Sequence, residues 1–290
     1  MILTNRQLFD LGVAKSLYLE RVKTGRVMLA QAELRRYIAR LIRDLGPTIL
    51  ALETSSYSAA NALVTEFRKW DRVAGAAMLA AIMALLDETL DTEIELSRVV
   101  WGLDLPKREQ LEAVVFDRPI GETGLTVRQM ADKWRASVSV GIIGVIQSGA
   151  TFQRTPKEIL DLIKSQVTAK SGALNSVVRT GVQSAANRAF SSRVEWYRWV
   201  SILDSRTSDI CRSLAHKVFQ RGKGPLPPMH PRCRSSVVPH DPNGDDFDEP
   251  TLEGWLSEQS TGDLKSLTSE SPLTLDQYRN QVKKWHSKHD

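Results

Sequence analysis

The chain has 290 residues, enough for about two domains of ordinary size. Hydrophobic residues make up 42% of it and charged residues 25%, which is close to the soluble globular average and excludes a disordered or collagen-like chain. Its 2 cysteines are too few for a scaffold built on disulfides. The net charge of +5 is too small by itself to indicate a nucleic-acid-binding protein.

The charge is unevenly distributed along the chain. Residues 151–240 carry 15 Lys and Arg against 5 Asp and Glu, a net charge of +10. Residues 241–290 carry 5 against 11, a net charge of −6. A local charge of +10 is enough to attract a phosphate backbone or an acidic protein surface, and a solvated basic face is the simpler alternative.

No targeting or membrane segment is expected. The first residues lack a basic stretch followed by an apolar one, so the sequence predicts no signal peptide. The longest apolar run, Val73–Leu86, has 14 residues, fewer than the roughly 18 needed to span a bilayer. We therefore expect this run to be a buried helix and the protein to have no membrane contact.

The first hundred residues predict helices. Over residues 30–45, apolar side chains recur at positions i, i+3, i+4 and i+7, with arginines on the other faces. The Gly-Pro pair at 46–47 is a helix stop signal. Two more helices are expected over 59–70 and 73–90, and prolines and glycines predict a loop with short elements over 101–127.

The middle of the chain predicts further helices. One begins within residues 126–133. Thr155 is typical of an N-cap, because a proline follows at the first helical position and Glu158 lies in the first turn, and this helix should run to about Thr168. Residues 172–192 form the next expected helix.

After residue 193 the pattern changes to short strands. Residues 194–203 alternate and are rich in Trp, Tyr and Val, which favours a strand, and shorter strands are expected at 217–220 and 235–238. Beyond them, residues 241–250 are an acidic linker expected to be mobile. Two short helices are expected over 251–259 and 274–286.

These elements predict a mainly α fold with a small antiparallel β-sheet (α+β). The predicted organisation is a helical N-terminal region over residues 1–127, a compact module with a short three-stranded sheet over 128–240, and an acidic linker with a helical tail over 241–290.

Residues 203–240 concentrate the reactive side chains, since both cysteines and three of the five histidines lie there. Two thiolates and two imidazoles could hold a tetrahedral zinc ion, with Cys211, His216, His230 and Cys233 as ligands. The sequence lacks a close cysteine pair, so two alternatives stay open. The cysteines could be reduced and buried, or they could form one disulfide outside a reducing cytosol.

Asp204 and Arg206 lie two residues apart at the end of the first expected strand. Their spacing predicts a turn held by a carboxylate–guanidinium pair and by backbone hydrogen bonds. A catalytic aspartate is the alternative interpretation of Asp204.

The same segment resembles the phage Mu F-like minor head proteins, also called phage head morphogenesis proteins. The resemblance rests on a tryptophan-bearing strand, a Leu-Asp-x-Arg-Thr turn, a cysteine, a Lys-Val-Phe strand and a closing Pro-Pro-x-His-x-x-Cys-Arg run. The residues that carry it are Trp199, Asp204, Arg206, Thr207, Cys211, Lys217, Phe219, Pro228, His230, Pro231, Cys233 and Arg234. An Arg-Thr…Asn-Arg helix from Arg179 and a Gly-interrupted helix from Gly141 extend the resemblance to about residues 130–260.

The chain departs from the family pattern at two places. Many members carry additional cysteines three residues before Cys211 and two residues after Cys233, where this chain has Ser208 and Ser235. An Asp or Gly usual near the Lys-Val-Phe strand is replaced by Ala215-His216. The first departure removes two soft ligands and weakens the prediction of zinc.

The resemblance implies a structural protein of a tailed-phage virion. Such a protein is a minor capsid component that acts near the portal in head assembly, with a part in DNA packaging or ejection. The implied partners are the portal protein, the major capsid protein or scaffold, and packaged double-stranded DNA, with several copies around the portal. The implied location is the capsid interior or portal vertex, and the host cytoplasm during assembly.

The basic segment offers residues for contact with DNA or a protein partner, namely Arg179, Arg188, Arg193, Arg221 and Lys223. No complete hydrolase motif occurs in the sequence, so we expect no enzymatic activity and no cofactor beyond a structural zinc ion. The alternatives are a metal-dependent nuclease or peptidase that uses His230 and Asp204, and a free nucleic-acid-binding regulator. The regulator is disfavoured because no recognition-helix motif is present.

Overall fold

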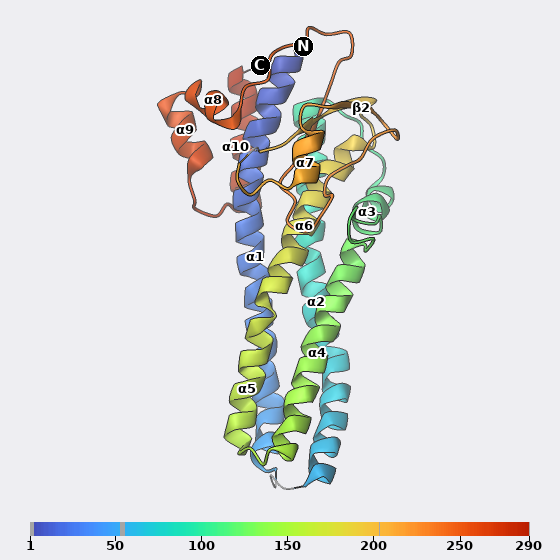
Figure 1. Cartoon of the computed structure of the whole chain (residues 1–290), viewed down its shortest axis with the longest axis vertical. Helices are drawn as coiled ribbons and strands as arrows, with labels where there is room; N and C mark the ends of the chain where they lie inside the picture. The colour runs from blue at the N-terminus through green and yellow to red at the C-terminus, as the bar shows by residue number, and fades with distance from the viewer. Residues whose placement is uncertain (1–2, 53–55, 203, 290) are drawn as a thin grey trace. The chain divides into compact units, whose positions relative to one another are not determined.

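The structure is a computed structural model that describes residues 3–52, 56–202 and 204–289. It confirms the expected fold class, since the chain is mainly helical with a small antiparallel sheet (Figure 1). In chain order the elements are α1 (Asn5–Leu50), α2 (Tyr57–Trp101), α3 (Arg108–Phe116), α4 (Val127–Thr151), α5 (Pro156–Ala169), α6 (Ser171–Ser191), β1 (Trp196–Val200), α7 (Asp209–Leu214), β2 (Val218–Gln220), β3 (Ser236–Pro239), α8 (Leu252–Ser257), α9 (Thr261–Thr268) and α10 (Leu275–His289).

The chain divides into two compact units. Unit 1 comprises Met1–Arg26, Leu86–Val127 and Arg179–Asp290, and unit 2 comprises Val27–Leu85 and Arg128–Val178. Helices α1, α2 and α6 therefore contribute residues to both units, and α4 contributes only its first residue, Val127, to unit 1. The units interleave along the chain; one break falls after Val127, where a boundary was expected, and none falls at residue 240. The three-part domain organisation stays a prediction.

The described part of unit 2 is a bundle of helical segments. Its core contains the apolar stripe of α1, where Tyr37 packs against Trp70 of α2 with ring centroids 5.1 Å apart. The buried Asp71 carboxylate accepts hydrogen bonds from Tyr37 at 2.7 Å, from Ser139 at 2.5 Å and from Arg135 at 3.3 Å. This network joins α1, α2 and α4.

Two predicted helix ends are wrong. Pro47 lies inside α1, which continues to Leu50, because a proline in the last turn removes only one helical hydrogen bond and the buried stripe continues to Ile49. Similarly, α2 runs unbroken through the polar pair at residues 71–72. That pair contains Asp71, which is satisfied within the bundle and does not start a turn.

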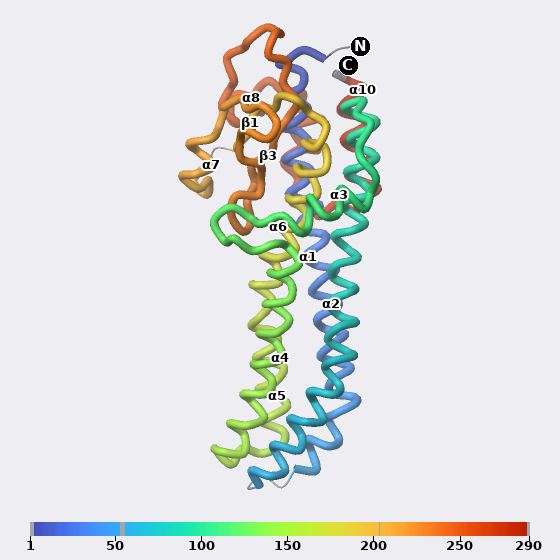
Figure 2. Tube along the Cα trace, turned by 90° about the vertical axis from the view of Figure 1, so that its right-hand side faces the viewer, coloured from blue at the N-terminus to red at the C-terminus, as the bar shows by residue number. Residues whose placement is uncertain are grey.

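The α4–α5 connection agrees with the sequence. Thr155 accepts a hydrogen bond from the Glu158 backbone N–H at 3.3 Å, and Glu158 accepts one from the Thr155 N–H at 2.7 Å, which is a capping box. The two helices run side by side (Figures 1 and 2), and a Cβ on Gly149 would lie 2.6 Å from Ile159. Glycine therefore permits this close approach.

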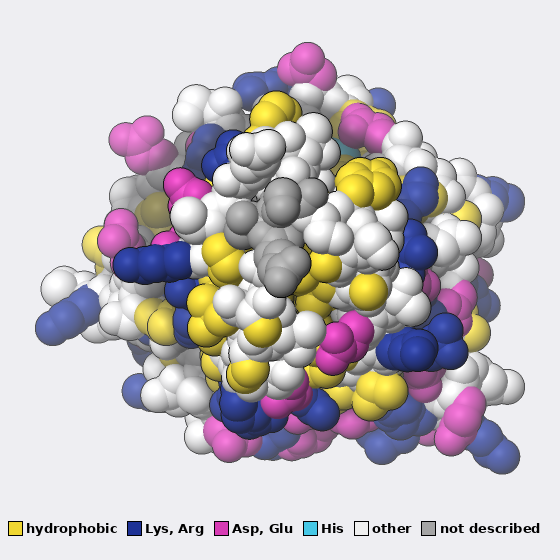
Figure 3. Space-filling model, turned by 90° about the horizontal axis from the view of Figure 1, so that it is seen from below, with side chains coloured by type: hydrophobic (Ala, Val, Ile, Leu, Met, Phe, Trp, Pro, Cys, Tyr) yellow, Lys and Arg dark blue, Asp and Glu magenta, His cyan; other side chains and the backbone are white. Residues whose placement is uncertain are grey.

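Exposed apolar residues occur in unit 2, among them Leu50, Tyr57 and Phe152. On the face drawn in Figure 3, hydrophobic side chains lie among basic and acidic ones. In the part of the chain that the structure describes, α2 is long and apolar enough to cross a membrane by length and composition, a test that the core helix of a soluble protein also passes.

The sheet lies in unit 1 and contains the three expected strands. Their order is β2-β1-β3, and both pairs are antiparallel. Trp199 pairs with Val237 of β3, and Tyr197 pairs with Phe219 of β2. The strand order makes β1 the central strand of the sheet. Its Trp199 is fully buried and lies in the small core beside the sheet.

The C-terminal tail is fixed to unit 1 more firmly than the sequence suggests. The expected mobile linker 241–250 is held by Asn5, whose side-chain amide donates to the Asp241 carbonyl at 2.9 Å, and by an ion pair between buried Glu249 and Arg198. Further along, Tyr278 of α10 donates to Glu93 at 2.7 Å. The expected tail helices are present as α8 and α10, and α9 between them was not foreseen.

Candidate functional site

The candidate site forms where α7 and the closing loop 227–235 meet beside the sheet of unit 1. Ser208 caps α7, because its hydroxyl accepts a hydrogen bond from the Cys211 backbone N–H at 3.4 Å. The cap places Cys211 in the first turn of α7, facing the core. The loop brings His230 and Cys233 to the same place from the other side.

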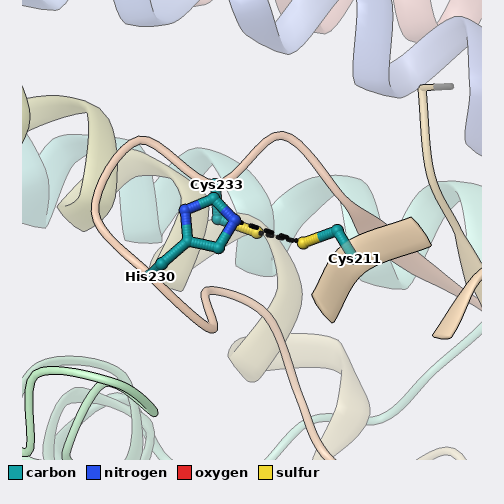
Figure 4. A group of neighbouring side chains, drawn as sticks. All are labelled: Cys211, His230 and Cys233. Atoms are coloured by element: carbon teal, nitrogen blue, oxygen red, sulfur yellow. Dashed lines mark hydrogen bonds between the residues drawn. The ribbon is translucent and has the colours of Figure 1, made fainter. Parts of the chain in front are cut away.

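The three side chains converge on one point (Figure 4). The Sγ atoms of Cys211 and Cys233 lie 3.6 Å apart, and His230 Nε2 lies 3.3 Å from Cys211 Sγ. Both cysteines are free thiols, with Cys211 2% and Cys233 0% exposed. Three of the four predicted ligands, Cys211, His230 and Cys233, therefore lie together.

Hydrogen bonds set the charges in this cluster. The Cys233 thiol donates to Cys211, and together with His230 and the hydroxyls of Ser208 and Ser235 it lowers the pKa of Cys211 against the effect of burial. The same bond raises the pKa of Cys233, and burial adds to this. The contact with Cys211 raises the pKa of His230. The contacts therefore favour the charged form of Cys211 over that of Cys233.

The imidazole of His230 has a fixed orientation. Its Nδ1–H donates to the Pro231 carbonyl at 3.0 Å, because a carbonyl can only accept. Nε2 therefore faces Cys211, and the Ser208 hydroxyl lies 2.9 Å from it. The two motif residues Pro228 and Pro231 belong to this loop, and Pro228 is buried.

Asp204 holds the turn before α7, as the sequence predicts. Its carboxylate accepts from the Arg206 backbone N–H at 2.8 Å and from the Arg206 guanidinium at 3.3 Å. Thr207 completes the turn by donating to the Ile202 carbonyl. A partner that the sequence did not identify, Arg234, makes two bonds to the same carboxylate, at 2.8 and 2.5 Å, and holds the pKa of Asp204 well below its usual range.

The polar face of α6 positions the closing loop and β3. Thr180 accepts from the Arg232 backbone N–H at 3.2 Å, Gln183 donates to the Ser235 carbonyl, and Asn187 accepts from the Val237 N–H at 3.0 Å. All three side chains are buried. Their spacing of three and four residues on one helix face was the available signal, and the sequence analysis did not use it.

His216 does not belong to the cluster of Cys211, His230 and Cys233, so its prediction as a ligand of the same site is wrong. Helix α7 ends at Leu214, so His216 no longer lies on the helix that carries Cys211 into the core. His216 has a φ of 68°, its Nδ1 contacts buried Glu249, and its backbone N–H donates to the Trp199 carbonyl. The neighbouring Lys217 is exposed, and its carbonyl continues the β1 ladder by accepting from Trp199.

Arg188 is not available to a partner, which contradicts its predicted contact role. It is 2% exposed, donates to the carbonyls of Arg118 and Pro119 at 2.7 and 2.9 Å, and burial lowers its pKa to about 10. Arg179 is half-buried and bonds to Glu20 and Thr24. These two arginines have structural roles in unit 1.

The other three predicted contact residues lie close together on the surface. Arg221 follows β2, and its guanidinium donates to the Ser192 carbonyl at 2.9 Å, beside Arg193. Its backbone N–H donates to the Glu195 carbonyl, and Lys223 lies in the turn that follows. Arg193, Arg221 and Lys223 are exposed. We call these three residues the basic edge.

A small pocket adjoins the cluster. It is lined by Cys211 and His230, by the hydroxyls of Thr207, Ser208 and Ser235, and by the arginines at 206, 232 and 234. Among the described residues, no carboxylate lines this pocket. No family model, curated protein or solved structure matches the chain.

Proposed function

We propose that the chain is a minor capsid protein of a tailed phage, of the Mu F-like head morphogenesis type. It acts structurally near the portal during head assembly, contacts packaged double-stranded DNA and is not an enzyme. Its partners are the portal protein and the major capsid protein or scaffold, and several copies surround the portal. It is carried in the virion after assembly in the host cytoplasm.

One observation carries this proposal. The residues on which the resemblance rests are spread over more than thirty positions, yet five of them, Asp204, Cys211, His230, Cys233 and Arg234, lie together in one segment of the structure. Asp204 pairs with Arg234, Cys211 contacts His230 and Cys233, and the Thr180–Asn187 face of α6 holds the loop between them. Residues that form one cooperating structure support a shared motif better than isolated matches do.

The positions of Ser208 and Ser235 also support the resemblance. Both hydroxyls lie against Cys211 and lower the pKa of its thiol, Ser208 from the cap of α7 and Ser235 from the start of β3. These are the positions at which many members of the family carry cysteines. A four-cysteine relative would thus place all four sulfurs around the same point.

A hydrolase is the weaker alternative. A hydrolytic metal site needs a carboxylate or similar base beside its bound water. Asp204, the predicted base, is held by Arg206 and Arg234, and its low pKa makes it a poor proton acceptor. Among the described residues, no carboxylate lines the pocket, Asp204 included.

Mass spectrometry of purified procapsids and virions tests the proposal. We expect this chain in both, at a fixed ratio to the portal protein. Absence from both particles would overturn the structural role. A sensitive nuclease assay tests the alternative, because cutting by the wild-type chain that is lost in His230→Ala would favour the hydrolase.

A further inference from the structure

The side chains of Cys211, His230 and Cys233 are arranged like a metal site. A tetrahedral zinc ion with Zn–S bonds of about 2.3 Å and a Zn–N bond of about 2.0 Å needs its sulfurs about 3.8 Å apart and sulfur and nitrogen about 3.5 Å apart. The corresponding distances here are 3.6 Å between the sulfurs and 3.3 Å between Cys211 Sγ and His230 Nε2. The three ligand atoms all lie within 4.8 Å of one another.

We infer that Cys211, His230 and Cys233 bind one zinc ion, with a fourth position open to water from the adjoining pocket. Two thiolates and an imidazole form a donor set that favours zinc over hard cations such as calcium or magnesium. The ion joins α7 to the closing loop, two segments that are separated by β2 in the chain. This inference is independent of the proposed function.

The groups around the ligands support the assignment. A metal-binding histidine usually donates its second ring N–H to a carbonyl or carboxylate, which fixes the tautomer and aims the other nitrogen at the metal. His230 does so, since Nδ1–H donates to the Pro231 carbonyl and Nε2 faces the sulfurs. Buried Lys23 also positions the closing loop, because its ammonium group donates a hydrogen bond to the Cys233 carbonyl at 3.2 Å.

The fourth position distinguishes this site from a closed structural site. The neighbouring donors are the hydroxyls of Ser208 and Ser235, which are weak zinc ligands. The pocket beside them is lined by arginines and by no described carboxylate. A water on the zinc ion therefore lacks a protein base, which fits a structural role for the metal ion.

Metal analysis of the full-length chain, purified with a reductant and without chelator, tests the inference. We expect about one zinc ion per chain, and a cobalt-substituted protein with the thiolate-to-metal charge-transfer bands of a tetrahedral site. Cys211→Ser, Cys233→Ser and His230→Ala should each lose the metal. His216→Ala is the matched control and should keep it, because that imidazole contacts Glu249 instead.

A gain-of-ligand variant covers the case in which the loss variants do not fold. Ser208→Cys places a third thiolate beside His230, so the cobalt charge-transfer absorbance should rise and zinc should bind more tightly than in the wild type. Wild-type protein that holds no zinc after reconstitution would overturn the inference. So would a disulfide between the two cysteines that persists in protein purified with reductant, or an unchanged cobalt spectrum in Ser208→Cys.

Discussion

Asp204 shows how one carboxylate can organise a turn. It accepts hydrogen bonds from a backbone N–H, from Arg206 and, through two bonds, from Arg234 thirty residues further along the chain. The pairing with Arg234 is the largest cause of its lowered pKa. The carboxylate thereby joins the start of α7 to the end of the closing loop, which gives it a structural role in this turn.

Asp204→Asn should destabilise the folded protein in a pH-dependent way. A carboxyl whose pKa is lower in the folded than in the unfolded state stabilises the folded protein. This stabilisation is fully present above the unfolded pKa of about 4, and it falls as the pH drops towards the folded pKa. We expect a loss of about 1–2 kcal/mol in the free energy of unfolding at pH 7, since hydrogen bonds to a charged group are involved. Urea unfolding at pH 7, 5 and 3 measures the free energy of unfolding of both proteins. The difference between the variant and the wild type should become smaller as the pH falls.

Asp161→Asn is the matched control for that measurement. Asp161 forms an exposed ion pair with Lys164 one helical turn away on α5. Exposed pairs contribute little, so its unfolding free energy at pH 7 should change by less than about 0.5 kcal/mol. If Asp204→Asn behaved like this control at pH 7, the turn would not depend on the carboxylate.

At the scale of elements, local patterns were sufficient where the signal was local. The Thr155 N-cap and the aromatic strand β1 were both predicted and are confirmed. The helix break expected at Pro47 was wrong because burial of Ile49 in the bundle outweighs a local stop signal. A sequence pattern over a few residues does not show which distant residues pack against them.

Gly25 of α1 offers a test of how closely that helix approaches the C-terminal tail. A Cβ at Gly25 would lie 2.7 Å from the backbone carbonyl oxygen of Leu273, which cannot move as a side chain can. Gly25→Ala should therefore lower the unfolding free energy by about 1–3 kcal/mol. Chemical denaturation, followed by Trp fluorescence that responds to unfolding of the C-terminal tail, would measure this change in the unfolding free energy.

Gly144→Ala in α4 is the corresponding control. A Cβ at this exposed glycine would have no other atom within 4 Å. Alanine has the higher helix propensity, so this variant should be neutral or stabilised by up to about 1 kcal/mol. Equal effects of the two variants would contradict the close contact at Gly25.

At the scale of the whole molecule, the sequence located the site but not all of its members. Cys211, His230 and Cys233 were grouped correctly because their chemistry is rare in this chain. His216 shares that chemistry but turns away after α7, and Arg234 reaches Asp204 through a fold that spacing does not reveal. Membership of a site depends on side-chain direction, which is fixed by long-range packing.

The same distinction applies to the basic segment. Its net charge of +10 is enough to attract a phosphate backbone or an acidic protein surface, yet Arg188 is buried and Arg179 is bonded to Glu20. A charge contributes to DNA binding only where a phosphate can reach it. The predicted surface for DNA contact is therefore narrower than the charge count implies. Of the five predicted contact residues, those of the basic edge are the ones to test.

Replacing Arg193, Arg221 and Lys223 together by alanine should weaken binding to double-stranded DNA without changing the fold. Each lost phosphate contact reduces the slope of log K against log salt concentration by about 0.9, so the slope should fall by up to about 2.7. Fluorescence anisotropy of a labelled duplex at several salt concentrations measures this. The control variant replaces three cations already paired with a carboxylate on their own helix, Arg36, Arg43 and Lys164. That variant has the same net charge, so equal slopes for the two would show that overall charge, and not the basic edge, governs the binding.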